Sequence, residues 1–178
     1  AGTLTEEARK MFLERVGVDV ERFEGGEVEA RKAYAQAIRK MAPALGADFS
    51  NLNEAQMCDD FHYTIFPNVT FNTHSLFVWV FVHRPHPEDP NKMLFDFTSL
   101  LNTPSQEVPR PEKMLLRTAD GDTLAGRCEG GDLMEEDLYN LPRIQAGMRS
   151  AAFRGLHLGT QEIRIRHHHA TLMQYLEA

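Results

Sequence analysis

One carboxylate falls on an apolar helical stripe in the segment 131–148. Asp132, followed three residues later by Glu135, forms a capping-box pattern, which predicts a helix that begins at Leu133. At helical spacing, Asp137 lies on the inward stripe, whose apolar members are Met134, Leu138, Leu141, Ile144 and Met148. A buried charge is costly unless it is paired or bound to a cation. Asp137 therefore calls for a partner, which the chain must supply or has lost.

The same segment allows a second interpretation, in which the helix begins only at Asn140 and Asp137 lies in a solvated acidic loop. Composition does not decide between the two. Pro142 cannot donate a hydrogen bond to the Leu138 carbonyl, so a helix through this segment is expected to kink one turn after Asp137.

Three consecutive histidines, His167, His168 and His169, invite a metal-binding interpretation. Successive side chains of an α-helix point about 100° apart and cannot converge on one ion. The surrounding residues 161–176 carry apolar side chains at helical spacing. We therefore expect a terminal helix and no metal site there.

His62 and His74 are further candidate ligands near the first predicted strand. They lie at its opposite ends, a span of roughly 40 Å in an extended chain, so they could share an ion only if the chain folded back. Cys58 precedes His62 without a matching second pair of ligands, and we interpret it as a structural cysteine.

The elements that must position these groups are helices and an antiparallel sheet. Residues 27–42 are rich in helix formers and end at Pro43. Residues 61–72 alternate with period two, interrupted only at Phe66 and Pro67. Two further strands are predicted at 75–84 and 92–101, and the short connections favour an antiparallel meander. We expect this sheet to pack against a helix at 133–149, with 161–176 as the closing helix.

Composition limits the possible functions. The chain has 178 residues, 42% of them hydrophobic, which suits a single domain over 1–178 with a partly helical lead-in at 1–24 and a core at 25–178. A formal charge of -7 is the wrong sign for binding nucleic acid. The longest apolar run, 76–82, is far shorter than the ~20 residues of a membrane span. Two isolated cysteines and no visible signal peptide favour a cytoplasmic protein.

Four segments in order resemble the C-terminal catalytic domain of the α subunit of Rieske non-heme iron ring-hydroxylating oxygenases. They are residues 60–68, 77–85, 136–150 and 162–176. The resemblance implies an α+β, helix-grip (START-like) fold, in which an antiparallel sheet wraps around a long C-terminal helix. It also implies an oxidoreductase that inserts oxygen from O2 into an organic, typically aromatic, substrate.

The resemblance further implies cofactors, partners and site residues. A mononuclear Fe(II) would be held by two histidines and one carboxylate, and the carboxylate's position matches Asp137. Electrons would come from a reductase or ferredoxin through a [2Fe-2S] Rieske cluster, and the parent enzyme would be a homotrimer. Phe66, Asn68 and Thr70 are candidates for the substrate pocket wall.

Two family motifs are missing from the sequence. Neither the Asp-x2-His-x4-His ligand motif nor the Cys-x-His and Cys-x2-His pairs of the Rieske cluster occur. We therefore expect the catalytic portion of an α subunit that lacks the cluster domain and two iron ligands, binds no cofactor by itself and is inactive alone. The alternatives are a metal-free helix-grip protein that binds a small apolar ligand, and an accessory subunit.

Overall fold

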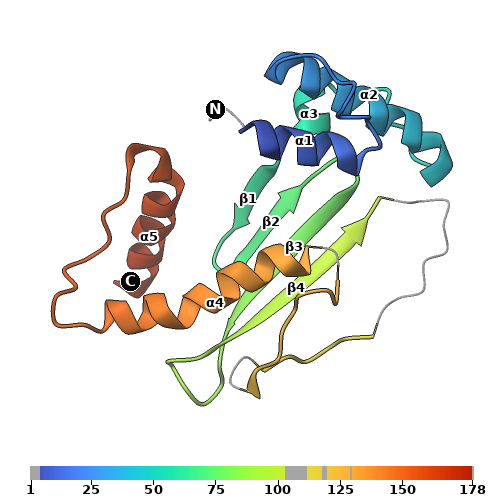
Figure 1. Cartoon of the computed structure of the whole chain (residues 1–178). Helices are drawn as coiled ribbons and strands as arrows, with labels where there is room; N and C mark the ends of the chain where they lie inside the picture. The colour runs from blue at the N-terminus through green and yellow to red at the C-terminus, as the bar shows by residue number, and fades with distance from the viewer. Residues whose placement is uncertain (1–4, 103–111, 118–119, 129, 178) are drawn as a thin grey trace. The chain divides into compact units, whose positions relative to one another are not determined.

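The chain divides into two compact units, Ala1–Pro109 and Arg110–Ala178. A computed structural model describes residues 5–102, 112–117, 120–128 and 130–177 (Figure 1). The first unit contains helices and a sheet: α1 (Glu6–Arg15), α2 (Glu27–Leu45), α3 (Glu54–Cys58), β1 (Phe61–Ile65), β2 (Val69–Thr73), β3 (Phe77–Pro85) and β4 (Met93–Leu101). The second contains α4 (Gly131–Met148), the 3-10 helix η2 (Thr160–Glu162) and α5 (Ile163–Leu176).

Helix α2 runs further than the sequence suggested. Pro43 was expected to end it, but the helix continues to Leu45. Gly46 then adopts a left-handed conformation with φ 70°, and its N–H group bonds the Pro43 carbonyl at 3.1 Å. A proline in the last turn removes only one helical donor, so the glycine that follows decides where the helix ends.

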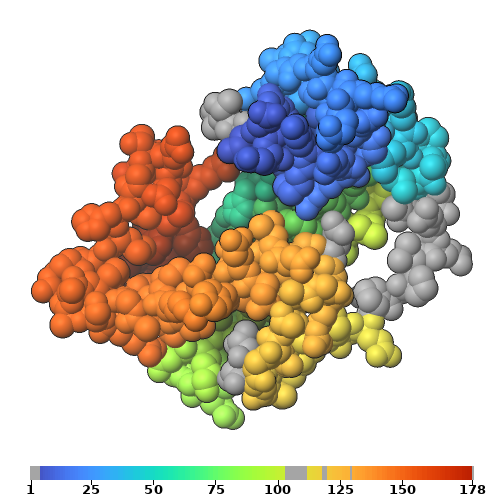
Figure 2. All heavy atoms as spheres, in the orientation of Figure 1, coloured from blue at the N-terminus to red at the C-terminus, as the bar shows by residue number. Residues whose placement is uncertain are grey.

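The helical part of the first unit is held by an apolar core and an ion-pair network. Ile38 is fully buried at the centre of the core, which also contains Ala35, Ala42, Phe49 and Met57. Arg31 on α2 bonds Asp59 after α3 at 2.6 Å and contacts Glu54 at 3.4 Å. In the space-filling view the atoms of α1 and α2 form one continuous blue surface (Figure 2).

The four strands form one antiparallel sheet in the order β1-β2-β3-β4. This confirms the α+β class, the antiparallel meander and the strands predicted at 75–84 and 92–101. The single strand predicted over 61–72 is wrong, because the chain reverses after Ile65 and returns as β2. The turn contains a cis Phe66–Pro67 peptide bond. Alternation continues on both sides of this turn, which is why its period resembled one strand.

Truncation of Ile38 tests the importance of the helical core. Ile38→Ala removes a fully buried side chain, so the free energy of unfolding should fall by about 2–5 kcal/mol. Urea unfolding followed by circular dichroism measures the change. Val28→Ala, at a site 55% exposed on the same helix, is the matched control and should change stability by less than about 1 kcal/mol. Equal effects of both substitutions would contradict this assignment of the core.

Candidate functional site

One face of the sheet carries a continuous group of aromatic rings, which we call the aromatic face: Phe77, Trp79, Phe81, Phe95 and Phe97. The residues of β3 that belong to it alternate with valines that point to the other face, and β4 pairs in the matching register. The ring centroids of Phe77 and Trp79 are 4.9 Å apart, and those of Phe81 and Phe97 are 5.4 Å apart. Trp79 and Phe81 are 8% and 7% exposed, so these rings form a largely buried apolar surface.

A row of polar side chains crosses the same face. In the strand register His62 pairs with Asn72, Asn72 with Trp79, and Trp79 with Ser99. His62 Nδ1 lies 2.6 Å from Asn72 Oδ1, and Asn72 Nδ2 donates to Asp60 Oδ2 at 2.7 Å. In the part of the polar row on β1 and β2, the side chains are therefore engaged in hydrogen bonds. The polar row continues onto β3 and β4 through Trp79 and Ser99.

Two of the predicted pocket-wall residues meet at a histidine that sequence reasoning missed. Thr70 pairs with Phe81 on the aromatic face, and its hydroxyl oxygen lies 3.5 Å from His83 Nε2. Asn68 Nδ2 donates to the His83 carbonyl at 3.0 Å, so its amide ties the turn before β2 to β3. Phe66 lies in the turn between β1 and β2 and is half-buried. His83 could have been found by extending the alternation of Trp79 and Phe81 by one more step.

Burial affects the pKa of two histidines on this face, His74 and His83. Desolvation lowers the pKa of His83 from its ordinary value. Desolvation also lowers the pKa of His74, against the opposing effect of the Asp60 carboxylate. The neutral imidazole is therefore favoured in both, which leaves one ring nitrogen of each able to accept a hydrogen bond.

Asp137 lies on α4, which extends without interruption from Gly131 through Pro142 to Met148. The alternative in which a helix begins only at Asn140 is therefore wrong. The side chain of Asp137 is exposed in the described structure, as are Ile144 and Met148 from the expected inward stripe. Its orientation toward a cavity against the sheet stays a prediction.

The predicted capping box of α4 is wrong. The helix begins two residues earlier than expected, after Gly130 with φ 78°, and Gly130 is its N-cap. Asp132 and Glu135 instead bind the loop that precedes the helix. Asp132 Oδ1 accepts from the Gly126 N–H group at 2.9 Å, and Glu135 Oε2 accepts from the Leu124 N–H group at 2.7 Å. Because both residues lie inside the helix and not at its N-cap, their carboxylates accept hydrogen bonds from the amides of the preceding loop.

The family model for the ring hydroxylating alpha subunit (catalytic domain) matches residues 14–178. The chain belongs to this family. The predicted family resemblance and its α+β helix-grip class are thereby confirmed, and the match identifies an aromatic ring-hydroxylating oxygenase domain. No curated protein and no solved structure shows significant similarity to the chain.

The ring-hydroxylating family supports Fe(II) as the metal of the parent enzyme. Within the described ranges, however, no group of three or more His, Cys, Asp and Glu side chains could hold a metal ion. As the predicted ligand, Asp137 would supply one carboxylate, whereas a non-heme iron site of this type needs two imidazoles as well. The donors described in this α-subunit domain therefore do not complete an iron site.

The histidines named from the sequence occupy two different settings in this catalytic domain. His167, His168 and His169 lie on α5, which confirms the helical prediction. The wide separation expected for His62 and His74 is wrong, because β1 and β2 fold back on each other. Asp60 Oδ1 lies 3.5 Å from His74 Nε2, and His62 pairs with the neighbouring Asn72.

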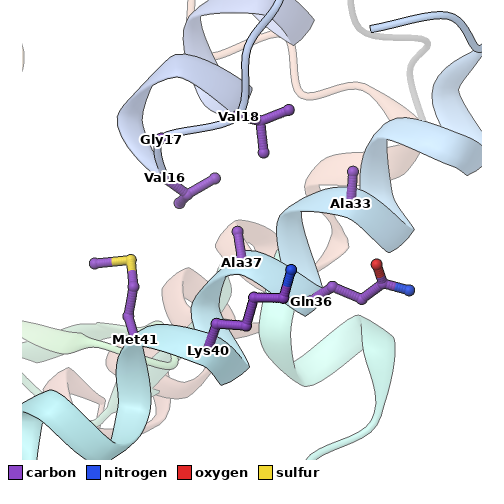
Figure 3. A pocket seen from close by; sticks show the side chains of 8 residues that line it. All are labelled: Val16, Gly17, Val18, Ala33, Gln36, Ala37, Lys40 and Met41. Carbon is purple, nitrogen blue, oxygen red and sulfur yellow. The ribbon is translucent and has the colours of Figure 1, made fainter.

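A shallow hollow of about 420 Å³ lies on the helical part of the first unit. Figure 3 shows Val16 and Val18, from the connection after α1, near Ala33 and Ala37 on α2. Lys40 is the charged side chain that lines it. None of the predicted site residues contributes to this hollow.

In the described part of this oxygenase domain, no helix is both long and apolar enough to cross a membrane.

The lowered pKa of His83 predicts acid sensitivity. In acid the folded protein binds fewer protons at His83 than the unfolded chain does. The free energy of unfolding is therefore highest above the pKa that His83 has in the unfolded chain. It falls as the pH drops through that value toward the pKa of His83 in the folded protein. Urea unfolding at pH 7.5 and at about pH 5 measures the difference. His83→Gln should reduce this difference. The control is Thr98→Val on the paired strand β4, which removes no titrating group and should leave the difference unchanged. An unchanged difference in His83→Gln would contradict the burial argument.

Proposed function

We propose that the chain is the substrate-binding part of a ring-hydroxylating oxygenase catalytic domain, and that the aromatic face of the sheet holds the substrate ring. The parent enzyme would insert oxygen from O2 into this ring. The observation that carries the proposal is the group of five aromatic side chains on one sheet face of a family member. Stacked and edge-on ring contacts suit a planar apolar ligand.

Within this proposal the polar residues beside the rings orient the substrate. Thr70 and His83 offer a hydroxyl and a neutral imidazole at one end of the aromatic face. Asn68 acts by positioning His83, since its amide holds the His83 carbonyl. Phe66 extends the apolar wall at the turn. These roles require that the substrate ring lies over Phe81, between the two ends of the face.

We propose Asp137 as the carboxylate ligand of the parent's Fe(II), with the histidine ligands supplied by residues outside this sequence. Because the described donors do not complete that site, we derive no step of oxygen activation from them. The Rieske cluster, the reductase or ferredoxin, the homotrimer and the cytoplasmic location belong to the same proposal. Its support is the family match and the absence of the two ligand motifs from the sequence.

A metal-free helix-grip protein that binds a small apolar ligand is the second candidate function. The observation that favours it is that the ring cluster of the aromatic face is complete within the sheet, whereas the described metal donors are not. Both functions share the ring site and differ in whether the parent protein needs Fe(II).

Ring binding is tested with toluene as the probe and Trp79, the single tryptophan of the chain, as the fluorescent reporter. Phe81→Leu keeps an apolar side chain but removes the ring contact to Phe97, so the affinity for toluene should fall about two- to tenfold. Val80→Leu is the control, because Val80 is the neighbour on the opposite face. Equal losses in the two variants, or no binding of toluene by the unmodified chain, would refute the proposed site.

Iron binding is tested by anaerobic calorimetry on the 178-residue chain. One carboxylate without imidazole partners holds a divalent transition metal weakly. We therefore expect weak binding of Fe(II), and Asp137→Ala should remove what specific binding there is. Asp132→Asn, at a carboxylate that bonds a loop amide, is the control and should leave the titration unchanged. Tight stoichiometric binding by the unmodified chain would mean that it carries a complete site.

A further inference from the structure

We infer that the substrate carries a neutral oxygen substituent, such as a phenolic hydroxyl, which is bound by Trp79 Nε1 and Ser99 Oγ. The inference rests on the proposed function, because it takes the aromatic face as the place where the ring binds. It adds the chemical class of the substrate. The ring would lie over Phe81 and Phe97, and its oxygen would point along the face toward the polar row.

Three shielded polar atoms gather around Trp79 without a hydrogen-bond partner among the described residues. They are His74 Nε2, Trp79 Nε1 and Ser99 Oγ. Trp79 and Ser99 are direct cross-strand partners, and the rings of His74 and Trp79 lie with their centroids 5.7 Å apart. Asp60 Oδ1 is 3.5 Å from His74 Nε2, which leaves that nitrogen without a hydrogen bond.

The neighbouring polar side chain on β2 is already engaged elsewhere. Asn72 pairs with Trp79 in the register and could have served its indole N–H group. Its oxygen instead contacts His62 and its nitrogen donates to Asp60. The amide is thus turned toward β1, and the donors on β3 and β4 remain unpaired. Buried donors without partners are uncommon and costly in native proteins, so their grouping at one point of a proposed site indicates a ligand.

The donor types define what this ligand must offer. An indole N–H group only donates, so Trp79 requires an acceptor. Ser99 can donate or accept, so it can serve either the oxygen or the proton of a ligand hydroxyl. A hydroxyl group satisfies Trp79 and Ser99 together, because its oxygen accepts from Trp79 Nε1 while its O–H group donates to Ser99 Oγ.

The charges nearby argue against an anionic substituent. The Asp60 carboxylate lies beside His74, which disfavours a second negative charge at this point. Arg84 pairs with Asp96 through two hydrogen bonds of 2.8 Å, and both residues belong to the opposite face of the sheet. An aromatic carboxylate would therefore bind less well than a phenol.

Because the three polar atoms are shielded from solvent, the ligand must displace the atoms that cover them.

The single tryptophan makes the inference directly measurable. The chain, labelled with nitrogen-15, has one indole N–H resonance, which is followed during titration with phenol, toluene and benzoate. Phenol should bind more tightly than toluene and shift the indole resonance downfield, as a new hydrogen bond to the indole would. Benzoate should bind more weakly than phenol. Ser99→Ala should weaken phenol binding about fivefold, the effect of one neutral hydrogen bond, and leave toluene binding unchanged.

Thr98→Ala is the matched control, because Thr98 is the adjacent hydroxyl on β4 and points to the opposite face. It should change neither titration. If toluene binds as tightly as phenol and Ser99→Ala has no effect on either, the inference is wrong while the proposed ring site stands. If Thr98→Ala weakens phenol binding as much as Ser99→Ala does, the inference is wrong as well. If none of the three probes binds, the proposed function itself fails and the inference fails with it.

Discussion

Antiparallel pairing of four strands in one register determines which side chains share a face of the sheet. A shift of a single residue would turn Trp79 and Phe81 to the opposite face and bring valines in their place. The same register aligns the polar side chains of β1 and β2 with Trp79 and Ser99. The proposed ring site, the row of polar groups and the unpaired indole donor all depend on this pairing.

The turn between β1 and β2 has a second consequence for the chemistry of this family member. By reversing the chain after Ile65 it brings Asp60, Asn72 and His74 to one end of the sheet. Their hydrogen bonds use the amide of Asn72, which leaves Trp79 without an internal acceptor. An interaction that stabilises the hairpin thus creates an unpaired donor on the neighbouring strand. We interpret that donor as available for substrate recognition.

Periodicity in the sequence was sufficient to predict the antiparallel strands and the helices α2, α4 and α5, because each has a regular apolar pattern over many residues. It failed at Phe66 and Pro67, where alternation on both sides of a turn resembles one interrupted strand. It also misplaced the start of α4, since the left-handed conformation of Gly130 is a property of the backbone that the side-chain pattern does not report. The pairing of Trp79 with Ser99 joins different strands, so only the register shows it.

The claim that the aromatic face binds the substrate ring is tested most directly by isotope-filtered nuclear Overhauser measurements on the carbon-13-labelled chain with bound toluene. We predict contacts from the probe to the rings of Trp79 and Phe81, which lie on one face of β3. Val80 and Val82 lie between and beyond these rings along the same strand and point to the opposite face. Contacts from toluene to the methyl groups of Val80 and Val82, without contacts to the two rings, would contradict the account.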